Sequence, residues 1–591
     1  MTQDDPSPPG ADGPQEVAVA RRHAGGAGLA YAELHAHTNF SLLDGTSDPE
    51  AMATQAAALG LRALAITDHD SIAGIVRFAA EAKRRAVHAI IGVELTVQAP
   101  RETAGARRSE RPSPASSARR RAVEEDERAA DRHVILLAQD LAGYQNLCRL
   151  LTRSYERGGK DHPHVPFDVL AHHHAGLIAL SACPSGELAS SLYEGGHEAA
   201  LGVAARYRDV FGADRYFVEL GRHLLQSDGP RNAGLTAVAR KVGVRCVATN
   251  DAHYHDSSRA LLHHVVTCIR HRTTLQDAGP LLRGNDEYFL KSPAQMARLF
   301  RQEIGQAVAD GCPDFDPVRT AAEIADRCTF GLGDIQYQFP HPRIPGGETE
   351  YSFLCRVVEA GKQLFYPNAS PEVEARSEHE LAIVQQLDLA GYLLVFREIV
   401  DWSHEHNILC SIRGSAPASA LLYCMGLCPI DPVEHHLLFE RFCSPERKEY
   451  PDIDLDFAHE RREEVIQHVY QKYGREYAAM VCEVNTYRVK SAIRDVAKVL
   501  GFSAQRAQQF ADQIDWYDPD PRDRLVRNDG APSAPSVPSV PGVPSTATIG
   551  APQAGTTVGS TKSAAEGAHG RQAAAPFSAS RPGGPGGMLA V

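Results

Sequence analysis

The first half of the chain alternates short apolar runs with longer patterns of helical periodicity. The runs have the length of β-strands and read LRALAIT (61–67), AIIGVEL (89–95), HVILLAQ (133–139), GLIALSA (176–182) and RCVATN (245–250). Between them, stretches such as PEAMATQAAALG and SIAGIVRFAAEAKRRA carry apolar residues with the spacing of an amphipathic helix. Alternation of this kind predicts an α/β fold with a parallel sheet. We expect a (β/α) barrel over residues 30–285.

Three stretches have compositions that do not suit a packed core. Residues 1–29 begin with an acidic, proline-rich segment, and residues 98–132 alternate basic and acidic blocks. Residues 518–591 are dominated by Pro, Ser, Ala, Gly and Thr. Such segments bury too little apolar surface to offset the entropy lost on ordering. We predict a disordered leader, a solvated surface insertion and a disordered tail, in that order.

Length and composition limit the classes of protein that fit. A chain of 591 residues exceeds one ordinary core, so two to four domains are expected. The net charge of −13 does not point to a nucleic-acid binder, so any DNA contact must depend on local clusters. The 12 cysteines form no CxxC pair, which argues against a zinc ribbon and a disulfide framework. The sequence has neither a membrane-length apolar run nor a secretory signal, so a cytoplasmic protein is expected.

Residue types that ligate metals gather at the ends of the strand-like runs. His35 and His37 form an H-x-H pair whose side chains share one side of a strand. Asp68-His69-Asp70 follows directly after LRALAIT. The other candidates are Asp44, Glu94, His133, Cys183, Asp251 and His253. Because the carboxyl ends of barrel strands converge on one mouth, we expect these side chains to cluster. The mixed ligand types suit Zn²⁺, Mn²⁺ or iron, and their number implies two or three ions that activate water for phosphoester hydrolysis.

Taken singly, these residues have simpler explanations. A lone Cys183 is typical of a core, and a lone His133 is typical of a satisfied polar side chain. Asp70 could cap a helix that begins near Ser71. The combination of H-x-H, T-D-H-D and N-D-x-H motifs at strand ends favours the metal site.

A second motif lies at residues 451–457, which read Pro-Asp-Ile-Asp-Leu-Asp-Phe. On a strand, this alternation places Asp452, Asp454 and Asp456 on one face. Crowded carboxylates repel one another, and a divalent cation between them relieves the repulsion. Two metals held in this way can activate a primer 3′-oxygen and stabilise a leaving pyrophosphate. The simpler alternative is an exposed acidic strand face.

Groups suited to phosphate lie upstream of this motif. The small-residue turn Arg413-Gly414-Ser415-Ala416 precedes an apolar, helix-like run, and its backbone N–H groups can cradle a phosphate. The segment LLFERFCSPER supplies Arg441 and Arg447, whose guanidinium groups suit phosphate recognition.

The segments that carry the candidate metal ligands resemble a known domain. AELHAHTNFSLLDG, ITDHDS, IGVEL and ATNDAHY are similar to the PHP domain at the front of bacterial replicative polymerase alpha subunits. The resemblance implies a (β/α)7-like barrel, a trinuclear metal centre and, where the domain is active, 3′–5′ exonuclease activity. The ligands that it implies, all of them present, are His35, His37, Asp44, His69, Glu94, His133, Cys183, Asp251 and His253.

The second half resembles the palm and thumb of C-family bacterial DNA polymerases. The similar phrases are RGSA-x-x-S, DPVEHHLLFERFCSPER, PDIDLDF and REEVIQHVYQKYG, and the continuation VNTYRVKSAIRD looks like the error-prone alpha-like enzymes. The resemblance implies a partial mixed α/β palm over residues 286–457 and a helical thumb segment over residues 458–517.

The same resemblance implies site residues. Asp454 and Asp456 match two of three catalytic aspartates that bind Mg²⁺, and Gly414 and Ser415 match a nucleotide-phosphate turn. The sequence departs from the family at Pro417 and at the position before Arg413, where the family tends to have glycine. The family's third catalytic aspartate and its fingers have no counterpart here, so we expect the N-terminal portion of such an enzyme.

Three functional hypotheses follow. The leading one is a DNA-directed DNA polymerase, a nucleotidyltransferase for replication and damage-tolerant synthesis. Its substrates would be a DNA primer–template and dNTPs, and its partners would be a sliding clamp or accessory polymerase proteins. The first alternative is a metal-dependent 3′–5′ exonuclease or phosphoesterase acting through the front domain alone. The second alternative is a non-catalytic interaction fragment.

Overall fold

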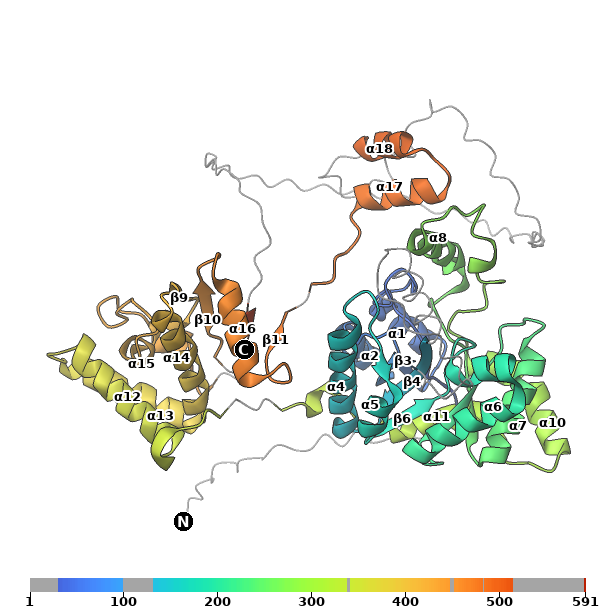
Figure 1. Cartoon of the computed structure of the whole chain (residues 1–591), viewed down its shortest axis with the longest axis horizontal. Helices are drawn as coiled ribbons and strands as arrows, with labels where there is room; N and C mark the ends of the chain where they lie inside the picture. Colours follow the sequence, from blue (N-terminus) through green and yellow to red (C-terminus); the bar gives the residue numbers. More distant parts are fainter. Residues whose placement is uncertain are drawn as a thin grey trace, which may run out of the picture. The chain divides into compact units, whose positions relative to one another are not determined.

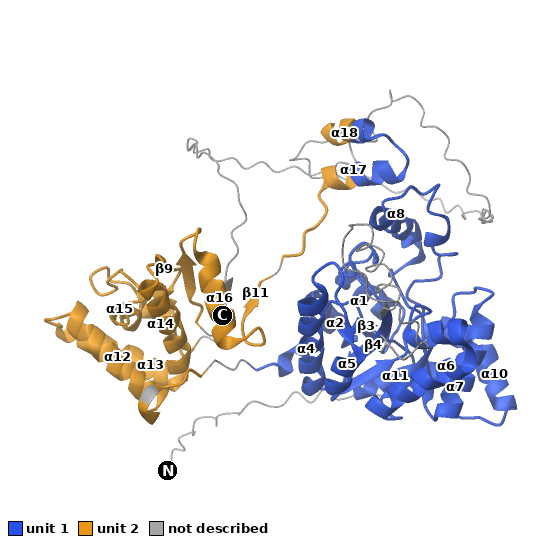
Figure 2. Cartoon of the chain, viewed as in Figure 1, with its two compact units in different colours: residues 1–338, 494–507 blue, residues 339–493, 508–591 orange. Residues whose placement is uncertain are grey.

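The computed structural model describes residues 30–98, 131–336, 341–446, 451–481, 483–513 and 589–590. The chain divides into two compact units (Figure 2). The first comprises residues 1–338 and 494–507, and the second comprises residues 339–493 and 508–591. The predicted leader, nearly all of the predicted insertion and nearly all of the predicted tail lie outside the described residues.

An eight-stranded sheet forms the centre of the first unit (Figure 1). Its strands are β1 (Ala32–Glu33), β2 (Ala63–Ile66), β3 (His88–Gln98), β4 (Asp131–Ala138), β5 (Val165–Pro166), β6 (Leu177–Leu180), β7 (Tyr216–Gly221) and β8 (Arg245–Thr249). The order is β1-β2-β3-β4-β6-β7-β8, and β5 pairs with β3. The two ends of the sheet meet where Ala36 bridges Ala252 and the His37 N–H donates to the Ala252 carbonyl at 2.8 Å. The predicted barrel-like α/β fold is therefore confirmed.

The direction of β4 departs from the prediction of a parallel sheet. This strand pairs antiparallel with both β3 and β6, whereas the other neighbouring strands are parallel. Residues 99–130, which connect β3 to β4, lie outside the described residues. The prediction of parallel pairing is thus wrong at β4.

The helices of residues 30–336 are α1 (Pro49–Ala58), α2 (Ile75–Arg85), α4 (Leu141–Gly158), α5 (Phe167–His172), α6 (Glu187–Phe211), α7 (Asp228–Val242), α8 (Ala260–His271), α9 (Pro293–Leu299), α10 (Arg301–Ala309) and α11 (Pro317–Arg327), as far as these residues are described. Of these, α1, α2, α4, α5, α6, α7 and α11 pack against the sheet. The start of α1 is fixed by Asp48, whose side chain accepts a hydrogen bond from the Ala51 N–H at 2.8 Å. Apolar residues on one side of α2, including Phe78 and Ala82, are fully buried.

The first unit extends past the predicted boundary at residue 285. Helix α11 packs against β8 and β1, where the two ends of the sheet meet. Its residues Val318, Ala321 and Ile324 belong to the barrel's hydrophobic core. Covering this closure with an apolar helix face buries surface that a domain ending at residue 285 would expose. Residues 286–338, which we predicted as the beginning of the palm, therefore belong to the first unit.

The second unit is built mainly from helices. They are α12 (Glu350–Phe365), α13 (Pro371–Gln386), α14 (Ala390–Glu405), α15 (Ala420–Cys424) and α16 (Arg462–Tyr473). Strand β9 (Cys410–Arg413) pairs antiparallel with β10 (Asp454–Phe457), and β11 (Ala479–Met480) pairs with β12 (Leu589–Ala590). Helix α14 lies at the centre of this unit, with Leu393, Phe396 and Val400 buried in its core. Helices α17 (Val489–Val499) and α18 (Ala504–Asp512) each contain residues of both units.

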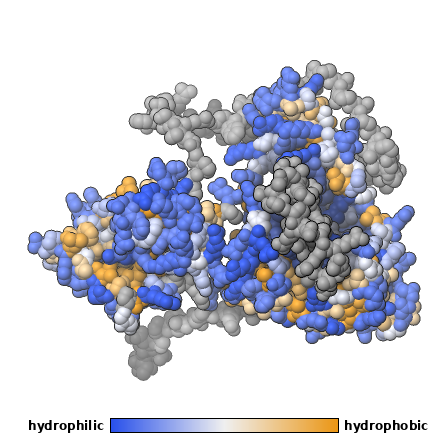
Figure 3. Space-filling view, in the orientation of Figure 1, coloured by the Kyte–Doolittle hydropathy of each residue, from blue (hydrophilic) through white to orange (hydrophobic). Residues whose placement is uncertain are grey.

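The visible faces of both units are largely hydrophilic, with hydrophobic residues in scattered patches (Figure 3). Among the described residues, no helix has the length and apolar character needed to cross a membrane.

Candidate metal centre and carboxylate pair

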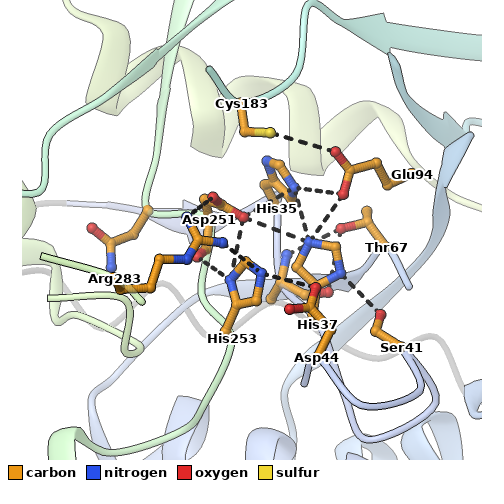
Figure 4. Close-up of polar contacts among 12 residues, drawn as sticks. His35, His37, Ser41, Asp44, Thr67, Glu94, Cys183, Asp251, His253 and Arg283 are labelled. Atoms are coloured by element: carbon orange, nitrogen blue, oxygen red, sulfur yellow. Dashed lines mark hydrogen bonds and ion pairs between the residues drawn. The ribbon is translucent and has the colours of Figure 1, made fainter. Parts of the chain in front are cut away.

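The nine predicted metal ligands meet at one end of the barrel. Figure 4 labels His35, His37, Asp44, Glu94, Cys183, Asp251 and His253 among them. Most come from positions at or just after the carboxyl end of a strand: His35 and His37 after β1, His69 after β2, Cys183 after β6, and Asp251 and His253 after β8. Asp44 lies in the loop that follows His37, and Glu94 lies within β3. The strand ends thus bring together side chains that are far apart in the sequence.

His133 reaches the same place from the opposite end of its strand. It is the third residue of β4 and pairs in register with Thr96, near the end of β3. Because β4 runs antiparallel, its beginning lies beside the carboxyl ends of its neighbours. The imidazole therefore joins the cluster although its strand starts at that edge.

Glu94 lies at the centre of the cluster and is 1% exposed. Its Oε2 lies 3.1 Å from His69 Nδ1, 3.2 Å from His37 Nε2 and 3.5 Å from His35 Nε2. Its Oε1 lies 3.0 Å from His133 Nδ1 and 3.6 Å from Cys183 Sγ. One carboxylate thus touches five of the other eight predicted ligands.

Asp251 and Asp44 continue the cluster on either side of His253. Asp251 Oδ1 lies 3.4 Å from His253 Nδ1 and 3.5 Å from His37 Nε2. Asp44 Oδ2 lies 3.3 Å from His253 Nε2 and 3.0 Å from His69 Nε2. Neighbouring sets of donors share members, so the cluster could hold more than one ion.

Burial and neighbouring charges shift the pKa values of several residues in this cluster. Burial raises the pKa of Glu94 and of Asp251, but the surrounding imidazoles outweigh it and hold each pKa well below its usual value. Burial opposes protonation of His37, yet the nearby carboxylates of Asp251 and Glu94 raise its pKa to about 9. Burial and the nearby Arg283 guanidinium lower the pKa of His253 to about 4, so this ring is neutral, as a metal ligand must be.

Several buried polar atoms of the cluster have the properties of metal ligands. Within the described residues, Glu94 Oε2, His133 Nδ1 and both Asp251 carboxylate oxygens make no hydrogen bond, although imidazoles lie near them. Buried polar atoms are rarely left in this state unless an ion or water satisfies them. The mixture of imidazole, carboxylate and thiol donors fits Zn²⁺, Mn²⁺ or iron. The residues present therefore fit a metal centre of two or three ions.

Asp70 does not cap a helix. Its buried carboxylate accepts hydrogen bonds from the Thr96 N–H at 2.9 Å and the Thr96 hydroxyl at 2.6 Å. Helix α2 begins only at Ile75, after Gly74. Asp70 instead fastens the loop after β2 to β3, next to the ligands His69 and Glu94.

Residues behind the ligands fix the orientation of the imidazoles. Glu219 Oε1 lies 2.7 Å from His35 Nδ1 and also accepts a hydrogen bond from the Thr249 hydroxyl at 2.5 Å. This contact leaves His35 Nε2 facing the cluster. Neither Glu219 nor its strand β7 was predicted, although YFVELG (216–221) is an apolar run interrupted by one acidic residue.

Ser41 orients the His37 ring in the same way. The Ser41 hydroxyl lies 3.0 Å from His37 Nδ1 and donates to Asp68 Oδ1 at 2.8 Å. Asp68 also accepts hydrogen bonds from the N–H and the hydroxyl of Thr38. The first aspartate of the T-D-H-D motif thus supports the site from behind the ligands.

We expect Glu219→Gln to lower metal affinity by about 10- to 100-fold, the usual effect of removing an outer partner of a ligating histidine. The amide keeps the size of the side chain but loses the charge that holds the His35 ring. Retention of Zn²⁺ against a competing chelator measures the effect. Glu198→Gln, on the exposed surface of α6, is the matched control and should behave as the wild type. Equal retention in both variants would show that Glu219 does not position His35.

The predicted carboxylate pair lies on the strand pair of the second unit. Asp454 and Asp456 lie on β10, and Asp454 pairs in register with Arg413 on β9. Asp452 precedes the strand and is exposed. The predicted strand, with acidic and apolar residues in alternation, therefore covers residues 454–457 only.

Arg413 lies between the two aspartates. Its Nε lies 3.2 Å from Asp456 Oδ1, and its Nη2 lies 3.9 Å from Asp454 Oδ2. The guanidinium relieves part of the repulsion between the two carboxylates, a role that we predicted for a divalent cation alone. The sequence analysis missed this contact because it depends on the register between β9 and β10.

The predicted phosphate turn adjoins the pair. Gly414 has a φ of +81°, which only glycine adopts readily, and a side chain there would begin 3.5 Å from Asp454 Oδ2. Within the described residues, no protein acceptor is found for the N–H groups of Gly414 and Ser415. These N–H groups remain candidates for a phosphate contact.

The helix that follows the turn is closed to phosphate at its N-terminus. The buried Glu380 carboxylate accepts hydrogen bonds from the N–H groups of Ala420 at 3.1 Å and Leu421 at 3.2 Å, and from the Ser419 hydroxyl at 2.8 Å. A phosphate at the Gly414 turn would therefore not be shared with the N-terminus of α15. Arg441 is an exposed residue at the end of a 3-10 helix (Phe439–Arg441), and Arg447 lies outside the described residues.

Two family models match the chain. Residues 33–223 match the PHP domain, and residues 352–529 match the bacterial DNA polymerase III alpha NTPase domain. Error-prone DNA polymerase from Mycobacterium bovis is 41% identical over 493 residues, which cover 83% of this chain and 42% of that protein. The protein of the same name from Nocardia farcinica is 38% identical over 510 residues, covering 82% of this chain and 44% of that protein. The chain thus spans less than half the length of these relatives.

A solved amidohydrolase from Chromobacterium violaceum aligns with 38% of this chain and 88% of its own, at 18% identity and a TM-score of 0.23.

Proposed function

We propose that this chain, which contains a PHP domain and a bacterial DNA polymerase III alpha domain, serves in DNA-directed DNA synthesis of the error-prone type. The relatives that carry this name are 35–41% identical and match across both units. The second unit would contribute the carboxylates Asp454 and Asp456 to nucleotidyl transfer. Its substrates would be a primer–template and dNTPs.

One observation carries this proposal. The Asp454 carboxylate, its strand neighbour Arg413 and the Gly414 turn meet within one strand pair. Asp454 and Asp456 would hold Mg²⁺, which when bound stabilises negative charge on the attacking and leaving oxygens. The N–H groups of Gly414 and Ser415 would hold a nucleotide phosphate. Arg413 would keep the two carboxylates close to each other before the metal binds.

A second activity is supported by the metal centre of the first unit. We propose that the PHP domain hydrolyses phosphodiester bonds and shortens DNA from the 3′ end. The support is the set of nine predicted donor residues centred on Glu94, several of whose buried atoms make no hydrogen bond within the described residues. Bound metal ions would supply a nucleophilic hydroxide near neutral pH. The protein's own contribution would be to hold His35 and His37 in fixed orientations through Glu219 and Ser41.

A paired assay tests both proposals on the purified full chain. A 5′-labelled primer–template is incubated with Mn²⁺, with and without dNTPs, beside His35→Ala and Asp454→Ala variants. Primer shortening should disappear in the His35 variant and persist in the Asp454 variant. Extension that requires Asp454 would support nucleotidyl transfer by this chain. Absence of extension would overturn that activity for this chain alone, and shortening that survives His35→Ala would overturn the hydrolytic role of the cluster.

A further inference from the structure

Helix α8 brings an additional imidazole to the edge of the metal centre. His263, one turn into this helix, is 3% exposed. Its Nε2 lies 3.6 Å from Asp44 Oδ1, and its ring lies perpendicular to that of His253 with the centroids 5.3 Å apart. Within the described residues, neither ring nitrogen of His263 makes a hydrogen bond.

The burial of this ring calls for a partner. A buried imidazole usually gives at least one nitrogen to a hydrogen bond, because an unsatisfied polar atom in the interior is destabilising. The His263 backbone carbonyl accepts a hydrogen bond from the Thr267 hydroxyl at 2.8 Å, but this contact does not involve the ring. The ring instead faces Asp44 and His253, two of the predicted ligands.

We propose that His263 is a tenth ligand of the metal centre and holds one ion together with Asp44 and His253. The three donor atoms lie within 4.8 Å of one another, and all three residues are buried. Two imidazoles and one carboxylate form a set that suits Zn²⁺, Mn²⁺ or Fe²⁺. The inference rests on the proposed metal centre, and it extends the centre to a helix that none of the sequence motifs includes.

A cation already lies near the same carboxylate. Arg270, two turns after His263 on α8, places Nη1 3.5 Å from Asp44 Oδ1. Arg283 places Nη2 2.9 Å from His253 Nε2 and Nη1 3.6 Å from Asp251 Oδ2. Both guanidinium groups line the cavity of about 580 Å³ at the barrel mouth. If these arginines alone neutralised Asp44 and Asp251, His263 would have no part in metal binding, so the experiment must separate the two explanations.

The test measures metal content rather than catalysis. The full chain is stripped with a chelator, reloaded with Zn²⁺, separated from free metal and analysed for bound zinc. We expect His263→Gln to retain about one equivalent less than the wild type or to bind its weakest ion at least about 10-fold less tightly. His271→Gln, an exposed change of the same chemistry on α8, is the matched control and should retain the wild-type amount. Equal zinc content and affinity in the His263 variant and the wild type would overturn the inference.

A second variant distinguishes the loss of a ligand from misfolding of the chain. His263→Cys loaded with Co²⁺ should show a stronger thiolate-to-metal charge-transfer band than the wild type, because the new sulfur would bind the ion directly. Absence of the additional band in a chain that binds Co²⁺ would contradict ligation at this position. The proposed metal centre fails separately: if His35→Ala also leaves the zinc content unchanged, the cluster itself does not bind metal.

Discussion

Glu94→Gln should abolish DNA shortening by the first unit and strip the barrel of most of its metal. The Glu94 carboxylate contacts four imidazoles and the Cys183 thiol. An amide of the same size removes the negative charge and presents an N–H₂ group to atoms that must face a cation. We expect a loss of at least about 100-fold, the upper end of what the removal of an outer-shell partner causes.

Elemental analysis and a 5′-labelled primer assay measure the two effects together. Glu198→Gln, an exposed change of the same chemistry, should leave metal content and activity unaltered. If Glu94→Gln kept its metal but lost activity, Glu94 would act in the reaction without anchoring the ions. If it kept both, the cluster would have no hydrolytic role.

Glu380→Ala should destabilise the second unit by about 3 kcal/mol, the lower end of the cost of breaking a buried ion pair. The Glu380 carboxylate is 0% exposed, and it accepts hydrogen bonds from the first N–H groups of α15 and from Arg376 Nε at 3.0 Å. Alanine would leave these donors unsatisfied. The lower end is expected because Arg376 also donates to two backbone carbonyls, of Ala418 and Leu437, at 2.6 Å each.

Urea unfolding followed by circular dichroism measures this loss, and the transition of the second unit should move to lower urea concentration. Glu378→Ala, exposed on the same helix, is the matched control and should change stability by less than about 0.5 kcal/mol. A Glu380 variant as stable as the Glu378 variant would show that the capping network of α15 does not stabilise the unit.

Much of the barrel could be predicted from the sequence because strand and helix periodicity are local properties. The apolar runs at 61–67, 89–95 and 245–250 correspond to β2, β3 and β8. The motifs around His35 and Asp251 also identified a ligand set whose members the structure brings together. Their roles as ligands stay predictions until metal is measured.

Other features required the tertiary structure. A strand's periodicity does not tell its direction, so the antiparallel course of β4, which places His133 at the mouth, could not be read from HVILLAQ. The contact between His35 and Glu219 spans 184 positions in the sequence, and no spacing rule reaches that far.

The sequence by itself determined which residue types the chain offers for chemistry, namely the predicted metal ligands of the barrel and the paired aspartates of PDIDLDF. The tertiary structure alone decided which groups support or occupy those sites: Arg413 beside the aspartates, Glu380 at the N-terminus of α15 and His263 beside Asp44. The reason is physical. The type and local spacing of side chains are written along the chain, whereas their neighbours are set by strand register and helix packing between segments that the sequence keeps apart.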